Sequence, residues 1–398
     1  MSLNTCADAT MEPAFFDGMP DDVLIYADTE RSATLRHEIP LAIGDPFLYV
    51  EVAGRRVVLT NSLERDRLAR AVPDLELVLG DELGADDLVA EGMPRHEIDL
   101  ELAARLCRRV DLRTAVVPPE LPVVVADRLR AEGIELRPDH EAFDARRRAK
   151  NDAELAGIRR AQVAAEAGMA VCAALLREAR AEGGELRRDG APLLAEEVRT
   201  AIRDACAAHG AVAPSDTIVA RSDLFPGGHD PGHGPLAPDV PITVDLWPRD
   251  EESGCHADMT RTFVVGEPTA EVVAMHELSM EALRRSVAAA RPGVTGRALY
   301  DIACDVFEAA GHPTQRTKAP GQPLTEGFYF SLGHGVGLEV HEAPGLGRTG
   351  TEPLVPGDVI AVEPGTSRGG EAARVEDLVL VTEDGAETLT DFPYGLTP

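Results

Sequence analysis

The chain has 398 residues, a length that favours two domains over one core. Its formal net charge of −30 argues against binding to phosphate backbones or anionic lipid, so we predict neither a nucleic-acid nor a membrane partner. The sequence has no apolar run of about 18 or more residues, and its N-terminus does not resemble a signal peptide. We therefore expect a cytoplasmic protein with reduced thiols, since no CxxC spacing joins Cys6, Cys107, Cys172, Cys206, Cys255 and Cys304.

Residues 1–147 are predicted to form a small α/β domain. Alternating apolar residues indicate strands at 22–27 and 46–60, the second interrupted by an Ala-Gly turn. Amphipathic patterns indicate helices at 63–73 and 97–110. No His, Cys or carboxylate cluster with ligand spacing occurs here, so we expect a role in packing, assembly or shaping a cleft.

A second domain, 148–398, is predicted to begin after the charged stretch DARRRAK. Asn151 and Glu154 have the spacing of a capping box, which predicts a helix from this point. One face of that helix carries the apolar residues Leu155, Ile158, Ala161, Ala165, Met169, Cys172 and Leu176. The segment ELRRDG is expected to close it, and a further helix is expected at about 193–209.

From residue 218 the pattern changes to strands and Gly/Pro loops, with helices expected at 270–290 and 296–311. Thr295 is the predicted N-cap of the second of these helices. Two hairpin-like segments, 244–265 and 362–381, each carry a carboxylate on both arms. Asp245 and Glu363 are 118 residues apart, as are Asp258 and Glu376. This spacing predicts a duplicated half-domain in which each half supplies two carboxylates to one centre.

The four carboxylates require a compensating charge if they are buried. A carboxylate in an apolar strand is unfavourable by several kcal/mol unless it is paired or bound to a metal. A solvated strand face, or a salt bridge to Arg261 or Arg374, would explain one of them but not all four. His334 lies between glycines in GHGVGLEVHE and adds an imidazole. Such an oxygen-rich set suits Mn²⁺ or Co²⁺ best, with Fe²⁺ and Zn²⁺ as alternatives.

The ordered motifs DMTRTFVVG, GHGVGLEVHE, VEPG and RVED resemble those of the pita-bread metallopeptidases, which include prolidase, aminopeptidase P, methionine aminopeptidase and creatinase. The resemblance covers about residues 151–398. It implies an α+β protein in which a pita-bread domain follows a smaller α/β domain similar to that of the prolidase and creatinase branch. It also implies two divalent metal ions, with Mn²⁺ preferred, held by Asp245, Asp258, His334, Glu363 and Glu376.

The resemblance further implies catalytic roles for residues near the metals. Glu363 is expected to act as the general base, and His229 and His341 to face the substrate. His233 competes with His229, but His229 has the more usual spacing from the first ligand. Supporting contacts to the ligand carboxylates are expected from Thr260, Arg261 and Arg374. His256 is expected to be a strand residue, although it could also meet a substrate carboxylate.

Three positions depart from the usual pattern of the family. Phe330 stands where a His is common, Gly345 where an Arg is common, and Ser367 close to where a Tyr is common. The metal ligands are unaffected, whereas the substrate contacts differ. The prediction is a peptidase that cleaves between an N-terminal residue and a following proline in small peptides, as a dipeptidase or an aminopeptidase, and that forms a homodimer. The alternatives are a creatinase-like activity, a peptide-binding role, or an acidic interaction protein.

Overall fold

The computed structural model describes residues 22–224 and 228–398, which fall into two compact units. The first contains residues 22–28 and 45–140, and the second contains residues 29–44, 141–224 and 228–398. The structure divides the chain between His140 and Glu141, at the start of helix α6 (His140–Arg148). The boundary expected at 147/148 falls at the end of the same helix. The predictions for the N-terminus and for Cys6 fall outside the described residues. Among the helices that are described, none has the length and apolarity to cross a membrane.

The first unit contains a six-stranded sheet in the order β4-β3-β2-β1-β5-β6. Its strands are β1 (Val23–Ala27), β2 (Phe47–Val52), β3 (Arg55–Thr60), β4 (Glu76–Leu79), β5 (Thr114–Val117) and β6 (Glu135–Pro138). Around the sheet are η1 (Gly80–Leu83), α2 (Arg65–Ala71), α3 (Ala85–Ala90), α4 (Arg95–Arg109) and α5 (Val123–Ala131). The predicted turn between β2 and β3 is confirmed: Ala53 and Gly54 both have positive φ, at 49° and 75°.

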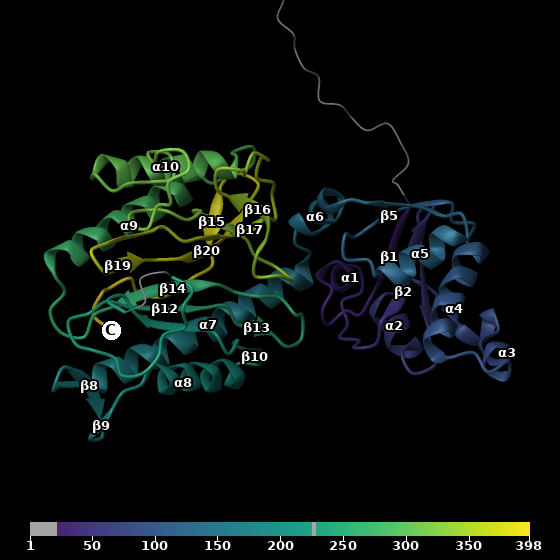
Figure 1. The fold of residues 1–398 in the computed structure, drawn as a ribbon, viewed down its shortest axis with the longest axis horizontal. Coiled ribbons are helices and arrows are strands. Elements are labelled where there is room, and N and C mark those ends of the chain that lie inside the picture. Colours follow the sequence, from purple (N-terminus) through teal and green to yellow (C-terminus); the bar gives the residue numbers. More distant parts are fainter. Residues whose placement is uncertain (1–21, 225–227) are drawn as a thin grey trace, which may run out of the picture. The chain divides into compact units, whose positions relative to one another are not determined.

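The helices of the second unit are α1 (Ala33–Glu38), α6, α7 (Asp152–Glu178), α8 (Ala195–Ala208), α9 (Ala270–Ala289) and α10 (Gly296–Ala309). The capping box of α7 is confirmed, because Asn151 accepts from the backbone N–H of Glu154 and the Glu154 carboxylate accepts from that of Asn151. Thr295 caps α10 as predicted. Helices α7 and α8 lie on one side of the strands, and α9 and α10 on the other (Figure 1).

The segment after α7 differs from the expectation. The helix ends at Glu178, before ELRRDG, and the chain then forms a three-stranded sheet of β7 (Arg180–Glu182), β8 (Glu185–Arg188) and β9 (Ala191–Pro192). The reason is local: Gly183 and Gly184 have φ of 64° and 83°, and Asp189 and Gly190 have φ of 52° and 80°. Two adjacent residues with positive φ are the geometry of a tight hairpin turn.

The strands of the second unit form two main sheets. The first has the order β11-β12-β14, from β11 (Ile218–Arg221), β12 (Ile242–Leu246) and β14 (Met259–Phe263). The second has the order β16-β15-β17-β20-β21, from β15 (Gly333–Gly335), β16 (Glu342–Leu346), β17 (Val359–Val362), β20 (Asp377–Val381) and β21 (Ala386–Thr388). Two short ribbons pair β10 (Ala211–Val212) with β13 (Arg249–Asp250), and β18 (Gly365–Arg368) with β19 (Glu371–Arg374).

The sequence repeat corresponds to two antiparallel pairs, β12 with β14 and β17 with β20. Asp245 pairs with Thr260 in the first. A shift of 118 residues would place Glu363 opposite Leu378, but Leu378 pairs with Ala361. The repeat therefore holds for the topology and not for the register. Apolar residues from both pairs are buried beneath the helices, so the site described below stands on a rigid core.

Candidate metal centre

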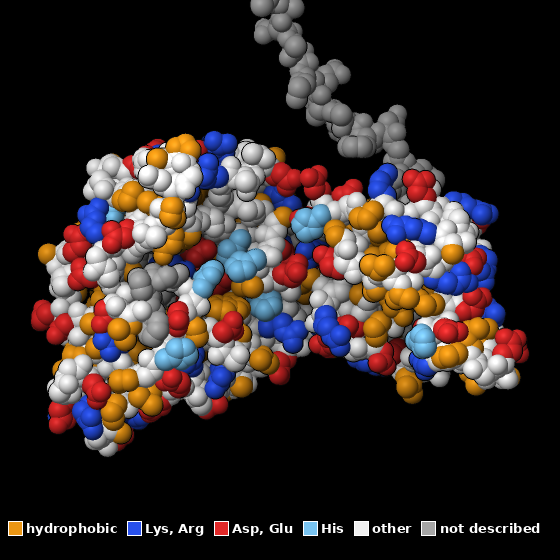
Figure 2. All heavy atoms as spheres, in the orientation of Figure 1, with side chains coloured by type: hydrophobic (Ala, Val, Ile, Leu, Met, Phe, Trp, Pro, Cys, Tyr) orange, Lys and Arg blue, Asp and Glu red, His pale blue; other side chains and the backbone are white. Residues whose placement is uncertain are grey.

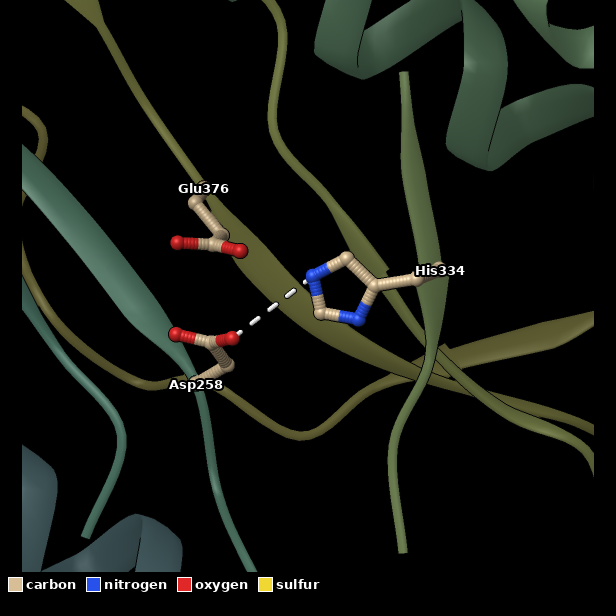
Figure 3. Close-up of side chains that lie close together, drawn as sticks. All are labelled: Asp258, His334 and Glu376. Atoms are coloured by element: carbon tan, nitrogen blue, oxygen red, sulfur yellow. Dashed lines mark ion pairs between the residues drawn. The ribbon is translucent and has the colours of Figure 1, made fainter. Parts of the chain in front are cut away.

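Asp258, His334 and Glu376 form a group that could hold a metal ion. Each offers one ligand atom, and these atoms all lie within 4.8 Å of one another. The three come from different segments: Asp258 directly precedes β14, His334 is the middle residue of β15, and Glu376 directly precedes β20. Figure 3 shows the two carboxylates and the imidazole pointing toward one another, with His334 Nε2 3.7 Å from Asp258 Oδ2.

The electrostatics of this group favour a bound cation. Asp258 and Glu376 are only 4% and 2% exposed. Burial, followed by the charges of neighbouring carboxylates, raises the pKa of both well above the usual range. Burial also lowers the pKa of His334 to about 4, so its imidazole is neutral. Because the carbonyl of Gly335 accepts a hydrogen bond from Nδ1, Nε2 has its lone pair available for a ligand. Two carboxylates and a neutral imidazole fit a divalent metal.

Asp245 and Glu363, the two other predicted ligands, lie at the edge of this group. Glu363 Oε1 is 3.7 Å from His334 Nε2, and burial raises the pKa of Glu363 to about 7. Both carboxylates also contact Arg374: its guanidinium donates to Asp245 Oδ2, and its Nη1 is 3.4 Å from Glu363 Oε2. Arg374 thus contacts two of the four carboxylates in the predicted ligand set.

The two remaining supporting residues behave differently from each other. Thr260 Oγ1 donates to Glu376 Oε2 at 2.7 Å, as expected for a residue that orients this carboxylate. The Arg261 side chain is buried and instead donates to the backbone carbonyls of Thr260 and Glu376 and to the carboxylate of Asp377. Within the described residues it contacts no carboxylate of the predicted ligand set. Alternation along the strand separates the two cases: Thr260 lies two residues after Asp258 and on the same face, whereas Arg261 points to the opposite face.

Glycines let the strand that carries His334 lie close to its neighbours. A Cβ on Gly333 would be 1.9 Å from the carbonyl oxygen of Ala361, and one on Gly335 would be 2.2 Å from that of Ala343. Larger residues would therefore push β15 away from β17 or from β16. This agrees with the close backbone approach expected from the GHGVG motif. The tight strand packing also sets where the His334 imidazole lies.

The predicted substrate-facing histidines lie beside the group. The rings of His334 and His341 are edge to face, with centroids 4.2 Å apart. Burial, followed by the electrostatic influence of His229, lowers the pKa of His341. His233 is 62% exposed and lies near Glu196 instead. His256 faces the carbonyl of Trp247, and burial lowers its pKa to about 4. Figure 2 shows histidines gathered at a hollow in this face.

Phe330, Gly345 and Ser367 are the three positions at which the sequence departs from the usual pattern of the family. Phe330 packs edge to face against Phe328, with ring centroids 5.3 Å apart, and so belongs to an aromatic cluster. Ser367 is buried on β18, while Gly345 on β16 is exposed and its backbone is open to one side. None of the three places an imidazole, guanidinium or phenol at the site.

The sequence analysis missed one ion pair close to the site. Lys150 and Glu342 are both buried and lie next to each other, and Glu342 directly follows His341. The signal was present in the sequence, since a lysine stands at the start of α7 and an acid follows the second histidine. Their separation of 192 residues concealed the contact.

Comparison with known proteins agrees with this geometry. The model of metallopeptidase family M24 matches residues 156–383. A probable dipeptidase PepE of Mycobacterium tuberculosis is 35% identical over 205 residues, which are 50% of this chain and 50% of that protein. The Xaa-Pro dipeptidase of Pyrococcus furiosus is 41% identical over 140 residues, 34% of this chain and 36% of the relative. The chain thus spans about half or less of the length of these curated relatives.

Solved structures share the fold along most of the chain. An Xaa-Pro dipeptidase from Bacillus anthracis superposes with a TM-score of 0.74 at 23% identity, covering 94% of each chain. An X-Pro aminopeptidase from Thermotoga maritima gives a TM-score of 0.73 at 22% identity, covering 94% of this chain and 96% of that one. The predicted α+β architecture with a pita-bread domain is confirmed.

Proposed function

The chain belongs to metallopeptidase family M24, and we propose that it is a dinuclear-metal peptidase that hydrolyses the bond between an N-terminal residue and a following proline. The observation that carries this proposal is the buried group of Asp258, His334 and Glu376, whose carboxyl pKa values are raised by burial and mutual repulsion. Such a group is stable with ionised carboxylates only when cations offset their charge. The proline preference is supported by relatives described as Xaa-Pro dipeptidases.

The residues that would hold the metals are Asp245, Asp258, His334, Glu363 and Glu376. Two divalent ions in such a site supply a nucleophilic water at neutral pH and polarise the scissile carbonyl. Mn²⁺ is the proposed ion, because four carboxylates and one imidazole form a mainly hard ligand set, with Co²⁺, Zn²⁺ and Fe²⁺ as alternatives. Arg374 would then contact one carboxylate oxygen of Asp245 and one of Glu363, Oδ2 and Oε2, while the metals bind these carboxylates, and it would hold both side chains in place.

Glu363 is the proposed proton carrier. In the metal-free chain burial raises its pKa to about 7. Cations bound beside it would lower that pKa and keep the carboxylate ionised, which is the form that accepts a proton. It would take a proton from the attacking water and return it to the departing nitrogen.

His341 and His229 are proposed to bind the substrate next to this centre. Burial and the nearby His229 lower the pKa of His341, so His341 is neutral at pH 7 and can donate one hydrogen bond to a developing oxyanion. The substrate is then a small peptide with proline at the second position. A homodimer in the cytoplasm remains the expectation for the assembly and its location.

The deciding experiment is a substrate-length series with each metal. The protein, stripped with chelator, is reconstituted with Mn²⁺, Co²⁺, Zn²⁺ or Fe²⁺ and assayed on Ala-Pro, Ala-Pro-Ala and Ala-Ala. Turnover of Ala-Pro, of Ala-Pro-Ala or of both, restored by metal and absent with Ala-Ala, is the expected result, and the length that is cleaved distinguishes a dipeptidase from an aminopeptidase. Equal hydrolysis of Ala-Ala would reject the proline preference. No hydrolysis of any peptide with any metal would reject the peptidase in favour of a creatinase-like or peptide-binding role.

A further inference from the structure

A small cavity of about 50 Å³ lies beside the metal centre. Its walls come from β11, β12, the segment before β15, β18 and β19, and they include Ser222, Thr243, Phe330, Ser367 and Arg374. Arg374 joins it to the centre, because the same guanidinium contacts Asp245 and Glu363. Whatever occupies the cavity therefore lies one side chain away from the predicted ligands.

Three of the residues that line this cavity each have a buried polar atom without a hydrogen-bond partner among the described residues: Ser222 Oγ, Ser367 Oγ and Arg374 Nε. Ser222 and Ser367 are only 3% and 6% exposed. In contrast, the neighbouring Thr366 hydroxyl is 2.9 Å from His312 Nδ1 and is satisfied. The three residues come from separate segments: Ser222 follows β11, Ser367 lies on β18 and Arg374 lies on β19.

An unpaired buried polar atom is unfavourable by about 1–3 kcal/mol, so three residues with such atoms around one cavity favour a polar occupant that pairs with them. The charges define what would pair with them. Arg374 disfavours an ammonium group, and Asp245 and Glu363 disfavour a carboxylate. A neutral hydroxyl can accept from Arg374 Nε and exchange hydrogen bonds with both serines.

We propose that this cavity binds a side-chain hydroxyl of the substrate and makes the enzyme selective for hydroxylated dipeptides. The inference rests on the proposed peptidase function, and it specifies the substrate class of that site. The volume admits a small side chain, and Phe330 and Ile218 supply apolar walls for its carbon atoms. Two residues of a dipeptide can carry such a hydroxyl: threonine before the scissile bond, or hydroxyproline after it.

The test compares isosteric pairs in two arms. The first measures kcat/KM for Thr-Pro against Val-Pro, and the second for Ala-hydroxyproline against Ala-Pro. A site built to pair with a hydroxyl discriminates strongly against the analogue that lacks it, so we expect at least about a tenfold preference in one arm. A preference in the first arm places the hydroxyl on the N-terminal residue, and one in the second places it on the imino acid. Equal values in both arms would overturn the proposal.

Variants show whether the preference comes from this cavity. Ser222→Ala and Ser367→Ala should each bring the ratio of the responding arm toward one. Ser286→Ala is the matched control, because Ser286 is equally buried on α9 but does not line the cavity. Its ratio should equal that of the unaltered enzyme. A preference that survives in both cavity variants would place the selectivity elsewhere and refute the inference.

Binding separates this inference from the peptidase proposal. Calorimetry on the Mn²⁺-loaded protein measures L-threonine against L-valine, and trans-4-hydroxy-L-proline against L-proline. Tighter binding of the hydroxylated partner, lost in Ser222→Ala and Ser367→Ala, supports the cavity assignment even if no peptide is cleaved. Equal binding within both pairs counts against it, whatever the peptidase assay shows.

Discussion

The ammonium group of Lys150 lies 2.5 Å from Glu342 Oε1 in an ion pair whose two side chains are only 2% and 3% exposed. The same ammonium donates to the backbone carbonyls of Arg147 and Arg148. The other oxygen of Glu342 accepts from the N–H of Glu339 at 3.3 Å. This pair therefore ties the start of α7 to the turn that carries His341, between Glu339 and Glu342.

Replacing Lys150 with Met should strongly destabilise the fold. The change leaves the carboxylate of Glu342 buried and without its main partner, a loss of about 3–5 kcal/mol in such pairs. Urea unfolding at pH 7 measures it. Arg159→Met is the control, because Arg159 and Glu387 form a pair in which both side chains are about half exposed, 48% and 50%. That variant should lose less than about 1 kcal/mol. Equal losses in the two variants would contradict the role assigned to the buried pair.

Glu363→Gln should abolish most of the activity while the protein stays folded. The amide keeps the shape of the side chain but cannot carry the proton, so kcat should fall by about 10²-fold or more. Steady-state kinetics and circular dichroism of the same preparation measure both effects. Glu371→Gln, an acid on β19 whose carboxylate contacts Thr269, serves as the control and should keep normal kcat. Full activity of Glu363→Gln would remove Glu363 from the mechanism.

Without metal, the buried carboxylates of the site should make stability fall as the pH rises from about 4.5 to 7. The pKa of Glu363 is about 7 in the folded chain against an ordinary 4.5, so the folded state binds more protons at this group than the unfolded state does in this range. Asp258 and Glu376 act in the same direction, whereas His334 and His256, with pKa values lowered to about 4, act in the opposite one. The contribution of Glu363 is therefore measured as the difference in slope between the unaltered chain and Glu363→Gln, by urea unfolding with chelator at a series of pH values. Equal slopes in the two proteins would contradict this account.

Thr260→Val should weaken metal binding more than it weakens the fold. The hydroxyl holds Glu376 Oε2 at 2.7 Å, and loss of such a supporting contact typically lowers metal affinity by about 10–100-fold. Competition with a fluorescent chelator measures the affinity, and Thr260→Ser should restore it. Thr262→Val is the control on the same strand, since its hydroxyl donates to the backbone carbonyl of Arg374. Equal affinity losses in Thr260→Val and Thr262→Val would show that the effect is not specific to Glu376.

His229→Ala should reduce kcat/KM by at least about tenfold, because loss of one substrate hydrogen bond of about 1.4 kcal/mol corresponds to that factor. His233→Ala should leave it unchanged, because this side chain is 62% exposed and lies near Glu196. The two histidines are four residues apart in one loop, so each variant controls for the other. A larger effect of His233→Ala would reverse the assignment.

The sequence by itself determined much of the fold. Strands at 22–27 and 46–60, helices α4, α9 and α10, and the cap at Asn151 all follow from local periodicity and side-chain capping, and the structure confirms them. It misplaced the end of α7, where two turns with positive φ replace the expected helix end. The pairs Gly183-Gly184 and Asp189-Gly190 are hairpin signals in the sequence itself, so local turn chemistry accounts for this difference.

For the site, the sequence determined which residue types are present, and the spacing of 118 residues predicted that the acids would meet. Only the tertiary structure decided how they meet. It brings Asp258, His334 and Glu376 together. It also places Asp245 Oδ2 and Glu363 Oε2 next to the guanidinium of Arg374. It also revealed the ion pair of Lys150 with Glu342 and the unpaired hydroxyls of Ser222 and Ser367. Burial and contact between distant segments set these properties, and neither is encoded in the neighbours of a residue along the chain.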